Sequence, residues 1–119
     1  MIPTGPATKV YLALGTTDLR KGFEGLSDLV RHQMKEEPMS GHLFAFTNRN
    51  RSRIKLLYWD GSGMWLLTKR LAKGRFSWPQ DEGASPAKGL RVLAEELTLL
   101  LSGIDLEKTR SRAWWRKAA

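Results

Sequence analysis

The chain of 119 residues has no cysteine, only two histidines, and no apolar run near the roughly 20 residues that a membrane-spanning helix needs. The lack of cysteine excludes disulfides, thiolate metal sites and a cysteine nucleophile. The N-terminal residues show no signal-peptide pattern, so we expect a cytoplasmic protein without membrane association. The length suits one domain with a modest core, and we expect residues 1–105 to form it and residues 106–119 to form a basic tail.

Acidic residues are fewer than basic ones: the chain has 12 Asp and Glu and 20 Lys and Arg, which gives a net charge of +8. Nearly all of the excess lies in residues 49–75, where eight bases accompany one acid, Asp60, for a local charge of +7. Such a concentration in a small protein favours a polyanionic partner, most often nucleic acid, although cations on a sheet edge also discourage aggregation. The predicted DNA contacts are Arg49, Arg51, Arg53, Lys55, Lys69, Arg70, Lys73 and Arg75.

The first half of the chain predicts a strand, a helix and a second strand. Residues 9–14 and 42–47 are typical of short strands. Between them, apolar residues recur over residues 23–34 at the three-and-four spacing of one helix face. Thr17 or Asp18 can cap the first turn of this helix.

The stretch RIKLLYWDGSGMWLLTKRL, residues 53–71, predicts a β-hairpin with a turn at Gly61-Ser62. This turn pairs position i with position 123 − i, so that Tyr58 lies opposite Trp65 and the open end is cationic. Tyr58, Trp65 and the later Phe76 are expected in the core, and Trp59 and Trp78 beside the cations could stack on bases. The second face is apolar near the turn, where its residues are Leu57, Trp59, Met64 and Leu66.

The last third predicts one more strand and one more helix. Residues 75–78 have the composition of a short strand, and Ser85-Pro86 is a helix-start signal ahead of an apolar stripe over residues 90–104. We therefore expect an α+β domain with a mainly antiparallel sheet of four to five strands and two helices packed on one face.

Catalytic chemistry finds little support among the acids and histidines. Asp18 is expected as a helix cap, Asp60 as a turn residue and Glu95-Glu96 on the polar side of the late helix. A metal site for nucleic-acid cleavage would need converging carboxylates or neighbouring histidines. His32 and His42 lie in separate elements, so the sequence predicts no catalytic residue, no metal and no cofactor.

Several segments in order resemble a known family. They are VYLALGTTDLRKGFEGLSDLV (10–30), GHLFAF (41–46) and RIKLLYWDGSGMWLLTKRLAKGRFSWP (53–79), with LLLSGID at the end of the late helix. Together they resemble the small TnpB-like accessory protein encoded by the second open reading frame of insertion sequence 66 family elements. The resemblance covers residues 9–105. It implies a part in transposition beside a separate, larger transposase, and it brings no established active site.

Charge and resemblance together predict a non-catalytic accessory protein for transposition of an insertion sequence. On the first hypothesis it binds DNA, at the element ends, through the basic hairpin. On the alternative hypothesis it is a protein-interaction module without direct DNA contact. Its docking face, on the transposase or on another copy of itself, would then consist of Leu57, Trp59, Met64 and Leu66.

Overall fold

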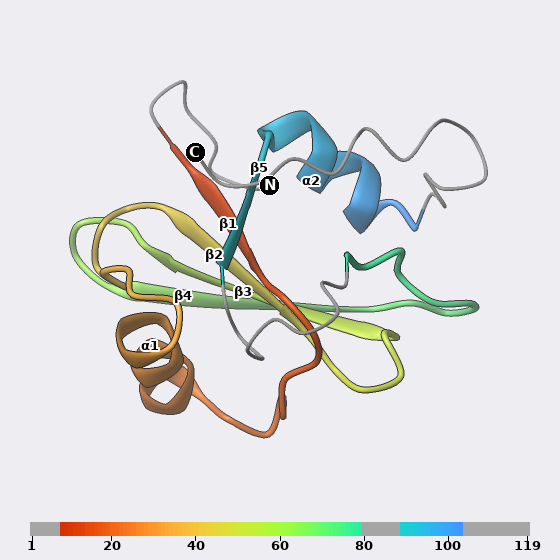
Figure 1. Cartoon of the computed structure of the whole chain (residues 1–119), viewed down its shortest axis with the longest axis horizontal. Coiled ribbons are helices and arrows are strands. Elements are labelled where there is room, and N and C mark those ends of the chain that lie inside the picture. Colours follow the sequence, from red (N-terminus) through yellow and green to blue (C-terminus); the bar gives the residue numbers. More distant parts are fainter. Residues whose placement is uncertain (1–7, 80–88, 104–119) are drawn as a thin grey trace.

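The computed structural model describes residues 8–79 and 89–103, which form one five-stranded sheet and two helices (Figure 1). The strand order is β4-β3-β2-β1-β5. The elements are β1 Val10–Ala13, α1 Phe23–His32, β2 Leu43–Thr47, β3 Arg53–Trp59, β4 Met64–Arg70, β5 Gly89–Val92 and α2 Ala94–Leu101. Only the β1–β2 pair is parallel among these, so the predicted α+β fold with a mainly antiparallel sheet is confirmed. None of the described helices has the length and apolarity to span a bilayer.

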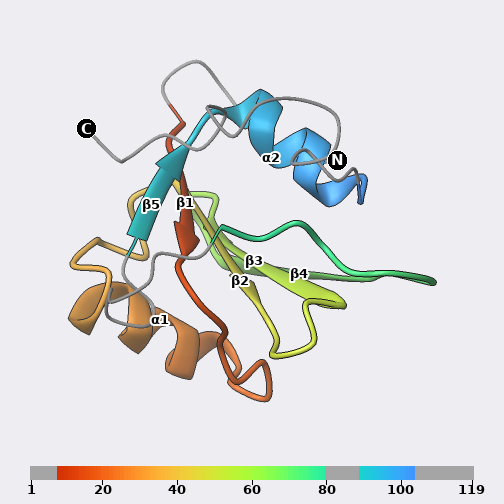
Figure 2. The same ribbon diagram turned by 45° about the vertical axis from the view of Figure 1, so that its right-hand side comes forward.

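The two helices lie on opposite faces of the sheet, which corrects the prediction that both would pack on one face (Figures 1 and 2). The crossover between the parallel strands β1 and β2 contains α1, whose buried residues meet Tyr11, Phe44 and Leu57. Helix α2 meets the alternate residues of the same strands, among them Leu12 and Leu43. All side chains of β1 and β2 are therefore buried, because a helix covers each face.

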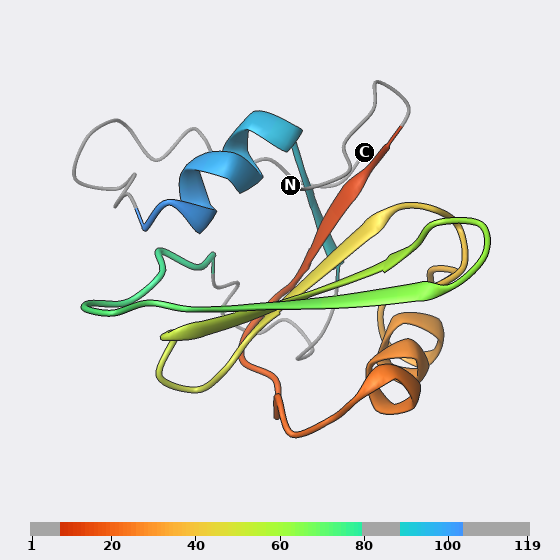
Figure 3. The ribbon, with the colours of Figure 1, turned by 180° about the vertical axis from the view of Figure 1, so that it is seen from behind.

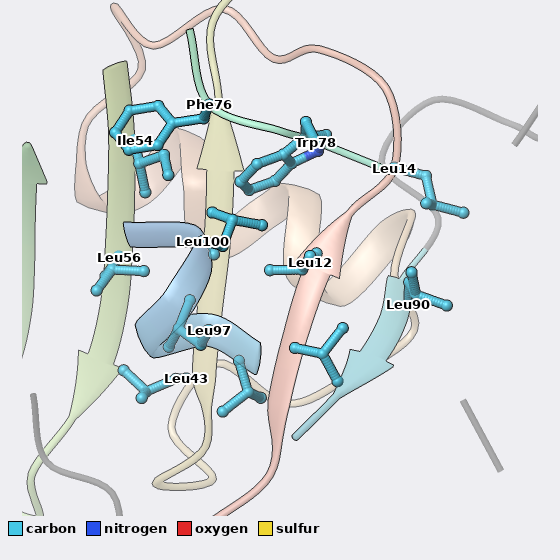
Figure 4. Packing of buried hydrophobic residues seen from close by; sticks show 13 residues of the cluster. Leu12, Leu14, Leu43, Ile54, Leu56, Phe76, Trp78, Leu90, Leu97 and Leu100 are labelled. Atoms are coloured by element: carbon cyan, nitrogen blue, oxygen red, sulfur yellow. The ribbon is translucent and has the colours of Figure 1, made fainter. Parts of the chain in front are cut away.

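The core on the α2 side also holds a segment without regular structure (Figure 4). Residues 75–78 do not form the predicted strand, yet Phe76 and Trp78 are almost fully buried. The Trp78 Nε1–H donates a 2.9 Å hydrogen bond to the Ala13 carbonyl oxygen. Trp78 is thus part of the core, and the prediction that it could stack on nucleic-acid bases is wrong.

The predicted late helix begins later than its apolar stripe indicates. Residues 89–92 form strand β5, which pairs with β1 and turns Leu90 and Val92 toward α2. Leu90 and Val92 are two positions apart, and both a strand and a helix can contain apolar residues at that spacing. The segment forms a strand because it pairs with the edge of β1. Glu96 is buried and its Oε1 accepts a hydrogen bond from the Leu93 N–H at 2.8 Å, so it is not on the polar side as predicted.

Helix α1 also starts later than predicted, at Phe23, with Gly22 as the N-cap residue and no side-chain cap. Neither Thr17 nor Asp18 caps it. Asp18 instead accepts hydrogen bonds from the backbone N–H and the guanidinium of Arg20, which closes a turn in the loop before the helix. Phe23, expected on the buried face, is 49% exposed.

The hairpin is confirmed in its predicted register, with Tyr58 opposite Trp65 and Arg53 opposite Arg70. Asp60 builds the turn: its Oδ1 accepts hydrogen bonds from the N–H groups of Ser62 and Gly63 at 2.8 and 2.9 Å. Trp65 is not a core residue, because it is 55% exposed and its indole N–H donates to Asp60 Oδ2 at 2.7 Å. The strong hydrogen bonds at the turn hold this indole on the surface.

Candidate functional site

A hollow of about 600 Å³ opens where the loop between β1 and α1 meets the loop between β2 and β3. We call it the basic hollow, since among the described residues four cations line it together with three threonines, two asparagines, Leu19 and one acid, Asp18. Its cations are Arg20, Arg49, Arg53 and Lys55. The hollow lies on the α1 side of the sheet, because Arg53 and Lys55 alternate with buried residues that face α2.

Backbone contacts fix the first wall of the basic hollow, the loop of residues 15–22. The Thr17 N–H donates to the Thr47 carbonyl oxygen at 2.8 Å, which ties the loop to the end of β2. The Lys55 ammonium donates to the carbonyl oxygens of Leu19 at 2.6 Å and Lys21 at 3.4 Å. Lys55 thereby joins the sheet to the loop and brings a positive charge to the floor of the hollow.

The second wall is the loop of residues 48–52, which folds around the side chain of Asn48. Its Oδ1 accepts hydrogen bonds from the N–H groups of Ser52 at 2.9 Å and Arg53 at 3.1 Å. Arg51 adopts a positive φ of 56°, an uncommon conformation for a residue with a side chain. The tight turn places Arg49 and Arg53 on the same hollow.

The positive charge of the basic hollow is largely uncompensated. Arg20 donates hydrogen bonds from Nε and Nη2 to the carboxylate of Asp18, the acid among the described lining residues, and the Oδ2 to Nη2 distance is 2.9 Å. These bonds lower the pKa of Asp18 to about 2, so it is ionised at neutral pH. Within residues 8–79 and 89–103, no carboxylate forms an ion pair with Arg49, Arg53 or Lys55.

Figure 3 shows the loop between β2 and β3 and the segment after β4 at the same end of the sheet, and the other predicted DNA contacts, with one exception on the α2 side, lie in these segments or at the end of β4. Residues 71–76 return beside the loop of residues 48–52, where the Phe76 N–H donates to the Arg51 carbonyl oxygen at 2.7 Å. The cations at this end besides those of the hollow are Arg51, Arg70, Lys73 and Arg75. Lys69 is the exception: it lies on the α2 side, and its ammonium donates to the Leu101 carbonyl oxygen at 2.6 Å.

The predicted docking face is only partly available. Leu57 is fully buried against α1, so it cannot contact a partner, which corrects that assignment. Leu66 is partly buried against the same cluster. Trp59 and Met64 line a second hollow of about 370 Å³, which we call the apolar hollow and whose other lining residues are Phe23, Glu24, Ser27, Asp28, Arg31 and Met39.

The histidines occupy ordinary structural positions. His42 Nδ1 accepts a 2.9 Å hydrogen bond from the Lys9 backbone N–H, and burial together with the nearby Lys9 charge lowers the pKa of His42. His32 ends α1 and is exposed. In the described part of the chain, no group of three or more histidines and acids is placed to bind a metal ion.

Sequence reasoning missed Arg20, Thr17 and Asn48 as lining residues of the basic hollow. A signal was present, because a polar and charged segment between a strand and a helix is where binding loops commonly occur. The Asp-x-Arg-Lys-Gly-Phe segment supplies Asp18 and Arg20, and the Arg-Ile-Lys start of the hairpin supplies Arg53 and Lys55. Two segments that carry the family resemblance therefore meet at one site.

Fold and hollow together define the class: a small basic α+β protein with a hollow lined by cations. The chain belongs to the family described as IS66 Orf2 like protein, whose pattern matches residues 8–111. This confirms the resemblance to the insertion sequence 66 accessory proteins, and the family indicates an accessory role in transposition.

Two proteins of Sinorhizobium fredii are similar to the chain over most of its length. The uncharacterized protein y4hO is 43% identical over 105 residues, which are 88% of each chain. The uncharacterized protein y4jC is 32% identical over 112 residues, which are 94% of this chain and 92% of its own. No solved structure matches the chain.

Proposed function

We propose that this protein is a non-catalytic accessory protein of transposition that binds DNA through the basic end of its sheet. The observation that carries the proposal is the gathering of four cations, from two loops and the start of β3, around one hollow in which Asp18 is the only acid among the described lining residues. The proposed surface consists of Arg20, Arg49, Arg51, Arg53, Lys55, Arg70, Lys73 and Arg75. Lys69 is outside it, because it faces α2.

Phosphate groups fit this surface for a chemical reason. Arginine offers a planar fork of N–H donors and lysine a compact positive charge, and both contact the phosphodiester backbone in protein–DNA complexes. Such contacts position a protein on DNA and release condensed counterions, so the affinity depends steeply on salt. The family context makes the ends of the mobile element the DNA to test first.

The test is a fluorescence-anisotropy titration of element-end DNA across a salt series. We expect the affinity to fall steeply as salt rises, and Arg53→Gln with Arg49→Gln to reduce the slope of log K against log salt by about 2, one unit for each lost phosphate contact. Lys69→Gln is the matched control for each of the two single substitutions, since it removes one positive charge from the opposite face. Binding that is indifferent to salt, or equally weakened by the control, would overturn the proposal.

A second candidate function is docking of the separate transposase on the apolar hollow. The observation in its favour is the exposure of two large apolar side chains at the rim, Phe23 at 49% and Met39 at 48%. Exposed apolar groups beside a half-buried tryptophan are typical of protein interfaces. On this hypothesis the transposase binds without DNA.

Co-purification of the two proteins after nuclease treatment tests this second function. We expect Phe23→Ser with Met39→Ser to abolish capture of the transposase. Leu93→Ser is the matched control, because Leu93 is 46% exposed and lies at the start of α2, away from the apolar hollow. Capture that survives the double substitution, or self-association in place of capture, would contradict docking at this site.

A further inference from the structure

The shape and charge of the basic hollow point to a ligand more specific than the backbone of continuous DNA. We propose that it binds a terminal phosphate group, a phosphomonoester, such as the 5′ end of a DNA strand or a free nucleotide carries. For the DNA source the inference rests on the proposed function. For a free nucleotide it stands independently.

The shape of the basic hollow suits a terminal phosphate. The hollow is bounded by the pinned loops of residues 15–22 and 48–52 and by the sheet. Its volume of about 600 Å³ falls within the range of small-molecule sites. A bridging phosphodiester continues in two directions and needs a groove open at both ends. A terminal phosphate continues in one direction only, so it can enter a hollow with walls.

The charge of the basic hollow also suits a terminal phosphate. A phosphomonoester carries about −1.5 to −2 charges near neutral pH, whereas each phosphodiester of a duplex carries −1. Arg49, Arg53 and Lys55 line the hollow without a carboxylate partner in the part of the chain that is described. Three uncompensated cations match the larger charge of the monoester better than that of one diester.

The basic hollow also supplies hydrogen-bond donors for a terminal phosphate. The Lys55 ammonium donates to the Leu19 and Lys21 carbonyl oxygens, and its third N–H has no acceptor among residues 8–79 and 89–103. Arg20 is oriented by Asp18 through Nε and Nη2, and its Nη1 makes no hydrogen bond to the described residues. A terminal phosphate has three non-bridging oxygens to accept such donors.

Thr17, a largely buried residue, gives an independent indication. Thr17 lines the hollow and is only 8% exposed, yet its hydroxyl makes no hydrogen bond within residues 8–79 and 89–103. A buried hydroxyl without a partner costs free energy, and such groups in native proteins commonly indicate an unseen ligand or water. A phosphate oxygen in the hollow would supply the acceptor.

The test uses two single-stranded oligonucleotides of one sequence, with either a 5′-phosphate or a 5′-hydroxyl, and a nucleoside 5′-monophosphate alone. We expect the phosphorylated strand to bind about tenfold more tightly, as charge-assisted hydrogen bonds to one added group imply. Thr17→Val, which keeps the shape and removes the hydroxyl, should reduce this preference. Lys73→Gln, outside the hollow, should weaken both strands equally and leave the preference unchanged.

The outcomes separate the two proposals. If both strands bind equally, the terminal-phosphate site is overturned while DNA binding stands. If neither strand binds but the monophosphate does, and Thr17→Val weakens it, the hollow is a nucleotide site, and the titration with element-end DNA decides the proposed function separately. If the protein binds none of the three probes, the terminal-phosphate site is overturned, and the proposed function fails as well if element-end DNA does not bind. Thermal unfolding of each variant confirms that the comparison concerns folded protein.

Discussion

The two ends of the β3–β4 hairpin differ in how their polar groups are satisfied. At the turn, Asp60 accepts hydrogen bonds from two backbone N–H groups, a hydroxyl and the Trp65 indole. At the open end, Arg53 lies directly opposite Arg70, and neither forms an ion pair with the described acids. The turn therefore stabilises the fold, whereas the open end retains repulsion that a bound anion would relieve. Within one ribbon, structure and proposed function occupy opposite ends.

The largest expected effect on stability comes from a substitution in the middle of the β3–β4 hairpin, between its turn and its open end. Leu57→Ala should lower the free energy of unfolding by about 2–5 kcal/mol, because a fully buried leucine leaves a cavity against α1. Chemical denaturation measures this change. Leu66→Ala, at the partly buried position opposite, should cost less. Equal costs for the two variants would contradict the assignment of Leu57 to the core.

A smaller effect is expected at the turn. Hydrogen bonds from Ser62, Trp65 and Gly63 lower the pKa of Asp60, so the folded state favours the ionised form. Such a group contributes stability above its unfolded pKa of about 3.9, and this contribution is lost as the pH falls further toward its folded value. Asp60→Asn should therefore be less stable than the natural protein at pH 7.

Thermal unfolding from pH 7 down to pH 3 measures this difference. We expect the gap between the two melting temperatures to be constant above about pH 5 and to narrow below about pH 4. Trp65→Phe removes only the indole donor and should reproduce part of the gap. A gap that is unchanged at pH 3 would show that the Asp60 charge has no part in stabilising the turn.

The smallest expected effect is an increase in stability, whereas the other substitutions lower it. Arg70→Gln should raise the stability by about 0.2–1 kcal/mol at low salt, because it removes the repulsion with Arg53 across the two strands. The gain should shrink as salt is added, since both side chains are exposed. Denaturation at two salt concentrations measures it. A loss of stability at low salt would mean that the open end is not a site of stored repulsion.

Local patterns predicted some parts of the fold well. The hairpin register followed from its turn residues, and Leu56 and Leu67 pair as expected. The segment of residues 89–92 was assigned to the wrong element, because an apolar pair at short spacing suits either a strand or a helix. Its pairing with β1 depends on an edge that exists only in the assembled sheet. The placement of α2 on the face opposite α1 depends on the same assembly.

The candidate site also combines features that the sequence predicts with features that depend on the assembled fold. The concentration of positive charge in residues 49–75 is a property of the sequence, but the hollow that gathers part of it is not. Lys69 and Arg70 are neighbours in the chain and lie on opposite faces, because successive side chains of a strand alternate. Arg20 comes from a distant segment and reaches the hollow through the loop that Lys55 and Thr17 hold in place.

By itself the sequence determined the family, the basic character and the hairpin, since these depend on residue identity and on contacts between near neighbours. Tertiary structure alone decided that Leu57 and Trp78 are buried, that Trp65 is exposed, and that Arg20 joins Arg49 and Arg53. The physical reason is that burial and the convergence of charges depend on which distant segments share a face of the sheet. That sharing is settled only when strands pair and helices cover them.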